Sequence, residues 1–502
     1  MIKKMLVMVI AFIMAAICFM TGCESNQSNN GEATSAPTPM KTVEDGEIVV
    51  AVKNEIDFNT SVVANVDGNS AKVKTATGLE YTAEGFDKFS DGKFNFKGDF
   101  KIVFNAGAFA NNFNRYTICY ESSKPLKGTI AYNLNGKSKN ESFFLEKGKN
   151  TFNCLIESYL KGSKANGINY ISFESCSGGK TNLVVCDVLC EDYEVYTNDT
   201  YYVENARYKV GIRLLWGGGI SYISDSQNTV KDLSNLVNQA DEGRLIQQSY
   251  YGTGGNNEYK PGEFNNSVWA YNPVQGGDKY RNHSRIIDIV VEDFSVYIKA
   301  QPQDWSLNNK LTPSYMENSY TIYENYIRVD NKFVDFSGWE HRYAHQELPA
   351  FYTVSYLNTF TWYDGSSPWQ DDELTSRSDL KFWGDPKYAG DCRMPIKVSN
   401  TETWCAWTNK KDDYGIGIYV PNVDTFLAGK NAYNASKDPA NGACNYVAPI
   451  NTMKMVSFSP IEYSYIMTTG SLDEIREVFK ANKDFATNES LHKNYQSMRV
   501  KD

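Results

Sequence analysis

Ser284-Arg-Ile-Ile-Asp-Ile-Val-Val291 is followed, after a short gap, by Ser295-Val-Tyr-Ile-Lys-Ala300. Both segments are rich in β-branched and aromatic residues, a composition that favours strands. Segments of the same kind continue toward the C-terminus at Ser319–Glu324, Tyr326–Asp330, Lys332–Phe336, Trp404–Trp407, Tyr414–Val420, Met453–Phe458 and Glu462–Met467. Asp330-Asn331 predicts a turn between two of these strands. The C-terminal half is therefore predicted to consist mainly of strands.

The same pattern occupies the preceding part of the chain. Short apolar runs occur at Glu47–Val52, Phe94–Phe96, Phe100–Phe104, Tyr116–Tyr120, Gly128–Asn133, Glu141–Glu146, Thr151–Cys154, Asn169–Glu174 and Asn182–Asp187. Asn135-Gly136, between two of them, predicts a β-hairpin. Strands at regular spacing with almost no helical period indicate a β-sandwich. Their order resembles the jelly-roll, galactose-binding-like modules attached to many carbohydrate-active enzymes, which implies a binding or spacer role; a purely structural sandwich is the alternative.

One segment near the C-terminus has the pattern of a helix. Ser471 and Glu474 have the spacing of a capping box at the start of Ser471–Asn482. Leu472, Ile475, Val478 and Phe479 form an apolar stripe, which we assign to the core rather than to a site. Lys231–Gln239 is predicted to form one or two further helical turns.

The region Tyr201–Met498 resembles the large β-supersandwich of galactose mutarotases, a fold also found in domains of glycoside hydrolases and polysaccharide lyases. The resemblance rests on size, richness in strands and a loose order of polar motifs. The predicted fold class is all-β: an N-terminal β-sandwich or jelly roll followed by a large β-supersandwich with a C-terminal helix. The predicted domains are a signal peptide at 1–22, a tether at 23–45, a β-sandwich at 46–198 and the supersandwich at 199–502.

The N-terminus predicts export and lipid anchoring. Lys3 and Lys4 precede the apolar run Leu6–Met20, which is shorter than the roughly 20 residues of a membrane-spanning helix and suits a signal peptide. Thr21-Gly22-Cys23 resembles the lipobox of bacterial lipoproteins, which implies a lipid on Cys23. The polar segment Glu24–Lys41 then reads as a flexible tether. We therefore expect a lipid-anchored protein on the extracellular face of the cell membrane; an ordinary secretory signal with an incidental cysteine is the alternative.

Composition excludes several classes of function. The net charge of −10 argues against nucleic-acid binding and against a basic membrane-binding face. The 10 cysteines include no CxxC pair, which argues against a zinc ribbon or a thioredoxin-like site. Most of the cysteines are expected to be buried, and the sequence is also compatible with one or two disulfides. No cofactor is expected, although Asp371-Asp372-Glu373 is a candidate for structural calcium.

The segment Asn238–Asp278 has the composition of a carbohydrate-binding wall. Aromatic rings stack on sugar faces, and amides and charges bond hydroxyl groups, while glycines allow close approach of the backbone. The candidate ligand contacts are Asp241, Arg244, Gln247, Gln248, Tyr251, Trp269, Gln275 and Asp278, together with His341 and Trp369 from later in the chain. Tyr250, Trp305 and Trp339 are further candidates for sugar subsites. Gly243-Arg244 occupies a place comparable to that of a sugar-holding arginine of mutarotases; a structural pair between Arg244 and Asp241 or Asp278 is the alternative.

Two segments are candidates for acid–base chemistry. Histidine titrates near neutral pH, and His345 and Glu347, two residues apart, are expected on the same side of a strand. A hydrogen-bonded structural histidine is the alternative. Glu462 matches the late position of the catalytic glutamate of mutarotases, and burial in an apolar strand would raise its pKa. A salt bridge between Glu462 and Arg244 is the competing interpretation.

The sequence thus predicts a surface-anchored carbohydrate-active protein that cleaves an extracellular polysaccharide, as a glycoside hydrolase or a polysaccharide lyase. The expected His/Glu acid–base pair has His345 as the acid and Glu462 as the base. A mutarotase-type epimerase is less favoured, because a lipid anchor and an added sandwich suit polymers better than free monosaccharides. The expected partner is a poly- or oligosaccharide, with membrane contact through the lipid anchor only. A non-catalytic glycan-binding lipoprotein is the alternative.

Overall fold

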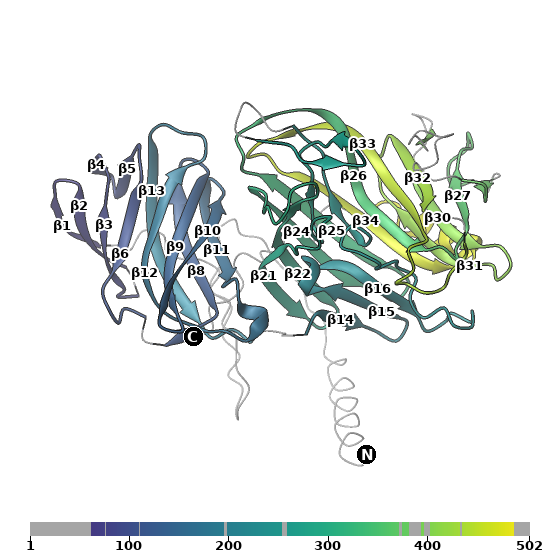
Figure 1. The fold of residues 1–502 in the computed structure, drawn as a ribbon, viewed down its shortest axis with the longest axis horizontal. Helices are drawn as coiled ribbons and strands as arrows, with labels where there is room; N and C mark the ends of the chain where they lie inside the picture. The colour runs from purple at the N-terminus through teal and green to yellow at the C-terminus, as the bar shows by residue number, and fades with distance from the viewer. Residues whose placement is uncertain are drawn as a thin grey trace, which may run out of the picture. The chain divides into compact units, whose positions relative to one another are not determined.

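The computed structural model describes residues 62–75, 77–109, 111–194, 198–253, 259–370, 374–380, 393–395, 402–431 and 434–485. All of them fall within one compact unit. Almost every regular element is a strand, which confirms the all-β prediction (Figure 1). The predicted signal peptide and tether, Cys23, the strand Glu47–Val52, Cys392 and the calcium candidate at 371–373 lie outside the described residues.

The first two sheets are formed by residues 62–191. The larger sheet has the order β1 (Val62–Asp67), β2 (Ser70–Lys74), β3 (Glu80–Glu84), β6 (Phe100–Phe104), β12 (Ala165–Ser175), β9 (Leu126–Leu134) and β10 (Lys137–Leu145), with β7 (Asn112–Phe113) beside β12. The smaller sheet has the order β11 (Gly148–Leu155), β8 (Arg115–Ser122), β13 (Thr181–Glu191), β5 (Lys93–Phe96) and β4 (Lys88–Ser90). A short 3₁₀ turn, η1, spans Tyr159–Lys161.

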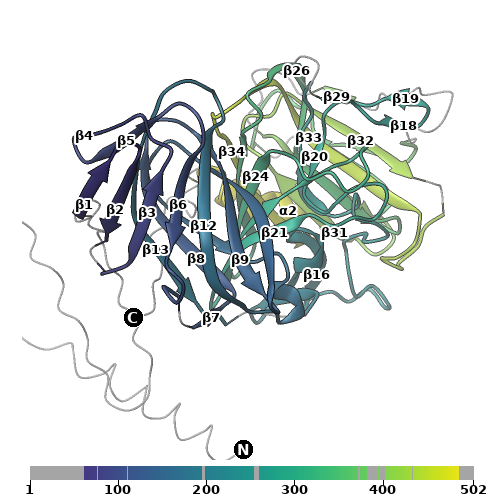
Figure 2. The same ribbon diagram turned by 60° about the vertical axis from the view of Figure 1, so that its left-hand side comes forward.

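These two sheets lie face to face (Figure 2), and aromatic side chains pack between them. Phe143 on β10 stacks on Phe152 on β11 with ring centroids 5.3 Å apart, and Phe100 on β6 stacks on Phe96 on β5 at 5.1 Å. The β9–β10 hairpin closes at Asn135 and Gly136, whose φ angles are 51° and 73°. Positive φ at both positions is what a two-residue hairpin turn requires. The predicted N-terminal sandwich and its Asn-Gly hairpin are thereby confirmed.

Two larger sheets follow, and all their strand pairs are antiparallel. One has the order β14 (Thr200–Glu204), β15 (Tyr208–Arg213), β16 (Gly219–Asp225), β17 (Ile246–Ser249), β26 (Glu340–Val354), β33 (Cys444–Val456), β32 (Thr425–Asn431) and β29 (Arg393–Pro395), with β20 (Pro273–Val274) and β23 (Gln303–Asp304) attached. The other has the order β21 (Arg285–Glu292), β22 (Ser295–Gln301), β24 (Ser314–Ile322), β25 (Ile327–Asp335), β34 (Ile461–Gly470), β31 (Tyr414–Tyr419), β30 (Trp404–Asn409), β27 (Thr359–Tyr363) and β28 (Leu374–Arg377). A small hairpin joins β18 (Glu263–Phe264) to β19 (Ser267–Val268), and η2 spans Leu214–Trp216. Every strand of the first two sheets precedes residue 198, and every strand of the two larger sheets follows it. The domain boundary at 198/199 stays a prediction.

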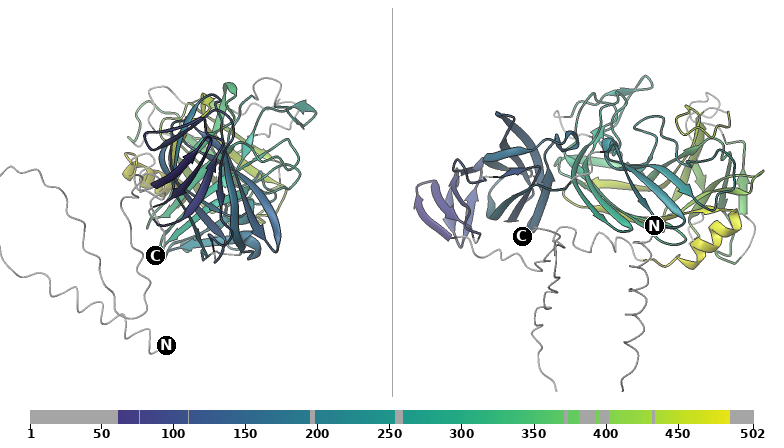
Figure 3. Two further views of the ribbon diagram at one scale, coloured as in Figure 1. Left: turned by 90° about the vertical axis from the view of Figure 1, so that its left-hand side faces the viewer. Right: turned by 90° about the horizontal axis from the view of Figure 1, so that it is seen from below.

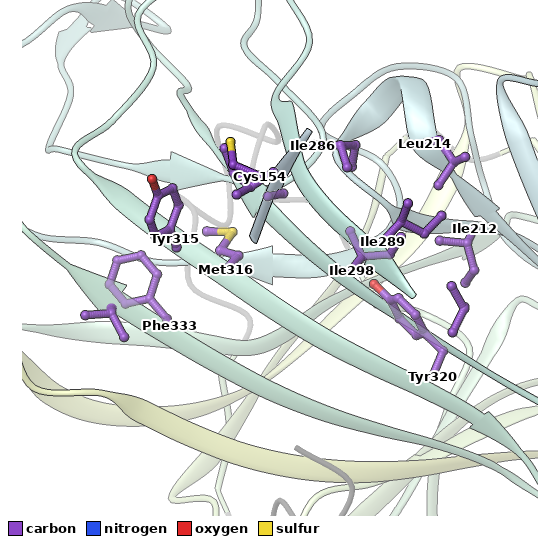
Figure 4. Packing of buried hydrophobic residues seen from close by; sticks show 14 of the residues in the cluster. Cys154, Ile212, Leu214, Ile286, Ile289, Ile298, Tyr315, Met316, Tyr320 and Phe333 are labelled. Atoms are coloured by element: carbon purple, nitrogen blue, oxygen red, sulfur yellow. The ribbon is translucent and has the colours of Figure 1, made fainter. Parts of the chain in front are cut away.

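Burial of apolar side chains between these sheets supplies the main stabilisation of the second sandwich. Figure 4 shows part of this core, in which Ile212 from β15 and Ile298 from β22 are fully buried. Tyr250, which follows β17, stacks on Phe333 of β25 with ring centroids 4.2 Å apart. Tyr250 is therefore a core residue and not a sugar subsite.

Two local predictions were wrong. Asp330-Asn331 does not form a turn, because both residues lie in the middle of β25 and pair with strands on either side. Asp330 is fully buried and accepts hydrogen bonds from the Arg328 guanidinium at 3.0–3.1 Å. Pairing with β24 and β34 on either side outweighs the turn preference of Asp-Asn. Lys231–Gln239 is not helical; it consists of turns and extended chain, with a β-bridge from Val237 to Thr353.

The predicted C-terminal helix is confirmed as α2 (Leu472–Ala481), which packs on β30, β31 and β34 (Figure 3). Ser471 accepts a hydrogen bond from the Glu474 backbone N–H, and the Glu474 side chain accepts one from the Ser471 backbone N–H. Ile475 and Phe479 are fully buried in the cluster beneath the helix. The apolar stripe is core, as the sequence predicts.

Candidate functional site

A cavity of about 470 Å³ lies in the second sandwich beside β17 and β26. Its lining includes the predicted contacts Asp241, Arg244, Gln247, Tyr251, Trp269 and Asp278, the predicted subsite residue Trp305, and Glu347 from the predicted acid–base group. The segment identified from its composition and one member of the predicted acid–base group therefore meet in one place.

Strand pairing and two glycines bring these residues together. Ser249 on β17 lies opposite Glu347 on β26. At Gly276, a Cβ atom would lie 2.1 Å from the backbone oxygen of Glu242, and at Gly277, where φ is 151°, it would lie 2.3 Å from the backbone oxygen of Asn282. Only glycine allows the chain to pass this close, so the pair keeps the Asn238–Asp278 segment folded against the sheet.

Glu347 is the chemically distinctive group of the cavity. It is buried, with 7% of its surface exposed, and accepts hydrogen bonds from the Tyr446 hydroxyl and, at 3.3 Å, from the Tyr251 hydroxyl. Burial raises the pKa of the Glu347 carboxyl above its ordinary value, and hydrogen bonds from its neighbours only partly offset this effect. A buried carboxyl that keeps its proton at higher pH than usual is suited to act as a general acid.

Aromatic rings form one wall of the cavity. Phe264 lies edge-on to Trp269 and to Trp305, with centroid distances of 5.1 Å and 5.7 Å. The indole N–H of Trp269 donates to the side-chain oxygen of Asn272 at 3.1 Å, which holds the ring in place. Tyr251 packs edge-on to the same indole ring at 6.3 Å. A cluster of oriented aromatic rings beside a carboxyl group is an arrangement that fits a sugar ring.

The Arg244 guanidinium, which lines the cavity, is held by a local ion pair. Arg244 Nε lies 3.1 Å from Asp241 Oδ2, and its Nη1 donates to the backbone oxygen of Gly442 at 2.6 Å. The structural pairing with Asp241 that the sequence left open is therefore present. Because both side chains also line the cavity, the pair forms a fixed polar edge rather than a free charge.

Three other predicted contacts support the wall. Asp278 is fully buried and accepts four hydrogen bonds: from the backbone N–H groups of Tyr280, Asn282 and Asn309, and from the Asn282 side-chain amide. Gln248 donates to the backbone oxygen of Glu317 and to the Asn318 side chain.

Gln275 donates to the backbone oxygen of Gly217 and to the Tyr320 hydroxyl. Gln248 and Gln275 are fully buried and lie outside the cavity lining. Their amide groups are used in holding the protein's own chain, so they position the wall from behind.

The two histidines of β26 do not line the cavity. His341 is buried; its Nδ1 accepts from the backbone N–H of Thr253 at 3.1 Å, and its Nε2 lies 3.4 Å from Asp335 Oδ2. His345 shares the strand face of Glu347, as predicted, but its Nδ1 lies 2.8 Å from the Thr452 hydroxyl, outside the lining.

Glu462 and Trp369 also lie elsewhere. Glu462 is exposed on β34, opposite Lys332 of the neighbouring strand, so the expectation that its carboxyl is buried is wrong. Strand alternation turns Glu462 to solvent and the flanking Tyr463 into the core. Trp369 is buried, with its ring 5.7 Å from that of Tyr419 in the cluster beneath α2.

The cavity also contains residues that the sequence did not single out. Phe264, Asn272, Tyr352, Asn431 and Cys444 belong to its lining. The pairing register of β26 shifts between Glu347 and Phe351, so simple alternation along the strand does not predict which face Tyr352 occupies. Asn431 and Cys444 come from β32 and β33, and no local pattern marks them.

Among the described residues, no group of three or more His, Cys, Asp or Glu side chains is arranged to hold a metal ion. Within the same ranges, no helix combines the length and apolar character needed to cross a membrane.

No family model and no curated protein matches the sequence. Among solved structures, the chain is similar to a galactose mutarotase related enzyme from Lactobacillus acidophilus, with 11% identity, a TM-score of 0.32 and coverage of 54% of this chain and 97% of that one. It is also similar to an α-galactosidase from Geobacillus stearothermophilus in complex with stachyose, with 9% identity, a TM-score of 0.31 and coverage of 55% and 41%. A 4-α-glucanotransferase from Thermococcus litoralis gives 10% identity, a TM-score of 0.28 and coverage of 54% and 37%. At this level of likeness, none of these structures identifies the ligand or the reaction of this protein.

Proposed function

We propose that this protein is a carbohydrate-active enzyme, a glycoside hydrolase or polysaccharide lyase, whose cavity binds a segment of a poly- or oligosaccharide. The observation that supports this proposal is Glu347, a buried carboxyl with a raised pKa in an aromatic-lined cavity. In hydrolysis Glu347 donates its proton to the leaving glycosidic oxygen, while a water molecule adds to the anomeric carbon and releases a proton to solvent. In elimination Glu347 gives its proton to the oxygen that leaves C4, while the proton on C5 of the uronate passes to a water molecule and a C4–C5 double bond forms. Glu347 thus takes the acid role that the sequence assigned to His345.

The lining also matches a polyhydroxylated ligand better than a purely apolar one. Rings of Trp269 and Trp305 offer faces for sugar C–H groups, while Asn272, Asn431 and the Asp241–Arg244 pair offer donors and acceptors for hydroxyl groups. A cavity of about 470 Å³ lies within the usual range for small-ligand pockets.

Incubation of the full chain with a panel of polysaccharides tests the proposal. New reducing ends are expected for a hydrolase, and unsaturated ends that absorb ultraviolet light for a lyase. Binding of a panel member without either product would instead establish a non-catalytic glycan-binding protein.

Trp269→Ala is expected to weaken substrate binding about tenfold, measured as KM or as the Kd of a product oligosaccharide, because it removes a ring that the cavity holds in place. Such a loss corresponds to about 1.4 kcal/mol. Phe294→Ala is the matched control, since Phe294 is an exposed ring in the turn between β21 and β22. Equal effects of the two substitutions would contradict a sugar subsite at Trp269.

We also propose that Cys23 carries a lipid that anchors the protein at the extracellular face of the cell membrane. In cells fed labelled palmitate, the wild-type chain is expected to take up label and to enter the detergent phase on Triton X-114 separation. Cys23→Ala is expected to lose the label and to move to the aqueous phase, because one thioether-linked diacylglycerol supplies the membrane affinity. Unchanged labelling and partitioning of Cys23→Ala would refute the anchor.

A further inference from the structure

A second cavity, of about 770 Å³, lies between the N-terminal sandwich and the second sandwich, within the compact unit Val52–Val500. Its walls come from β9, β10 and the segment after β11 on one side, and from residues 259–339 on the other. It shares no lining residue with the Glu347 cavity. Nothing in the proposed reaction uses it.

The walls of this junction cavity are well packed. Arg285 Nη2 lies 2.6 Å from Glu141 Oε2, and both side chains are at least nine-tenths buried. The backbone N–H of Phe144 donates to the Tyr315 hydroxyl at 2.8 Å, and the Phe144 ring stacks on Phe336 at 5.3 Å. These contacts join the two sandwiches around the cavity and fix its shape.

The lining concentrates positive charge in a protein whose net charge is −10. It contains Lys127, Lys260, Lys310 and Arg285 against the carboxylates Glu141 and Glu157. Lys127 pairs with Glu174 at 2.8 Å.

Lys260 and Lys310 are exposed, and neither ammonium group has an ion-pair partner among the described residues. Glu141 is already compensated by Arg285 and by the backbone N–H of Glu157, which donates to it at 2.9 Å. The Glu157 carboxylate is the remaining negative charge of the lining, so two lysines stand against one carboxylate and the net charge left for a ligand is positive.

Aromatic rings stand beside these cations. Trp339 and Tyr259 both line the cavity, with ring centroids 5.3 Å apart. The Tyr259 hydroxyl donates to Asp304 Oδ2 at 2.6 Å, which orients the ring. A ligand that satisfies both features has apolar ring faces and negative charges, as an acidic oligosaccharide does.

We propose that the junction cavity is a second glycan site, separate from the Glu347 cavity, that binds an anionic oligosaccharide. Lys260 and Lys310 bind its acid groups, and Trp339 and Tyr259 pack against its rings. This proposal goes beyond the proposed function and does not depend on proton transfer by Glu347. It identifies the ligand by its charge: an acidic chain binds here, and a neutral chain of the same length does not.

Calorimetric titration of the full chain in detergent micelles tests the site, with trigalacturonate as the anionic probe and its fully methyl-esterified form as the neutral match. Glu347→Gln serves as the background, so that the probe is not consumed. We expect at least tenfold tighter binding of the anionic probe, and weaker binding as salt rises, because screening weakens exposed ion pairs.

Lys260→Glu/Lys310→Glu is expected to lower the affinity for trigalacturonate at least tenfold. Lys410→Glu, which reverses the charge of an exposed lysine outside both linings, is expected to change it less than twofold. Equal affinity for the two probes, or unchanged affinity in the double variant, would overturn the proposal. If Trp269→Ala lost binding and the Lys260→Glu/Lys310→Glu variant kept it, the proposal would also be overturned, because the probe would then occupy the Glu347 cavity. This experiment measures binding alone. If the protein cleaved no polysaccharide, the proposed reaction would be refuted, but the binding result would still test the junction cavity.

Discussion

Under the proposed function, Glu347→Gln is expected to lower kcat/KM for polysaccharide cleavage by roughly 10²–10⁴-fold, the usual contribution of a general acid. The exchange preserves the volume of the side chain and an acceptor for the hydroxyl groups of Tyr446 and Tyr251, but it removes the transferable proton. Initial rates at several substrate concentrations measure the effect. Retention of full activity would refute Glu347 as the acid.

The pH dependence gives a second readout. Because the pKa of Glu347 is raised, the protonated, active form persists above the ordinary carboxyl range, and kcat/KM is expected to fall only as pH rises through that raised value. The native state also keeps this proton at pH values where the unfolded chain, with a carboxyl pKa of about 4.3, has released it. The contribution of Glu347 to the free energy of unfolding therefore decreases as pH rises from the unfolded pKa through the folded pKa.

It follows that Glu347→Gln, though inactive, is expected to have a Tm at pH 8 equal to or above that of the wild type, with the difference shrinking toward pH 4. A variant that unfolds more readily at pH 8 would indicate a structural carboxylate instead.

His345→Gln and Glu462→Gln are the controls that decide between the cavity and the acid–base pair predicted from the sequence. Both side chains lie outside the lining, so each exchange is expected to change kcat/KM less than threefold, which is about 0.65 kcal/mol. A decrease in kcat/KM as large as that of Glu347→Gln would support His345 and Glu462 as the acid–base pair instead.

Glu402→Ala is expected to destabilise the protein by about 3–5 kcal/mol, because it leaves a buried guanidinium without its counter-charge. Arg476 Nε and Nη2 lie 2.6 Å and 3.0 Å from the two oxygens of Glu402, and both residues are buried. The same carboxylate accepts from the Trp404 indole N–H at 2.8 Å and from the backbone N–H of Trp369. Chemical denaturation followed by circular dichroism measures the loss.

The double variant Glu402→Ala/Arg476→Met separates the ion pair from simple loss of packing. Removing both charges leaves no uncompensated ion, so the double variant is expected to be more stable than Glu402→Ala alone. A double variant at least as unstable as the single one would contradict this account.

Local chemistry was sufficient to predict much of this protein. The Asn135-Gly136 hairpin follows from the positive φ that its turn requires, and the start of α2 follows from the reciprocal Ser471–Glu474 bonds; both depend on residues a few positions apart. The contribution of residues 238–278 to one cavity wall was also visible, because most of its aromatic and polar members lie within one continuous segment. These local patterns do not depend on contacts with distant parts of the chain.

Contacts between distant segments decided the remainder. A strand pattern shows which residues share a face but not which face is covered, so only the tertiary structure placed Glu462 in solvent and Trp369 beneath α2. Asp330 is kept within β25 by pairing with β24 on one side and β34 on the other, against its local turn preference. Glu347 has its raised pKa because β17 and β33, distant from β26 in the sequence, bury its carboxyl, and burial is a property of the folded chain rather than of any sequence motif.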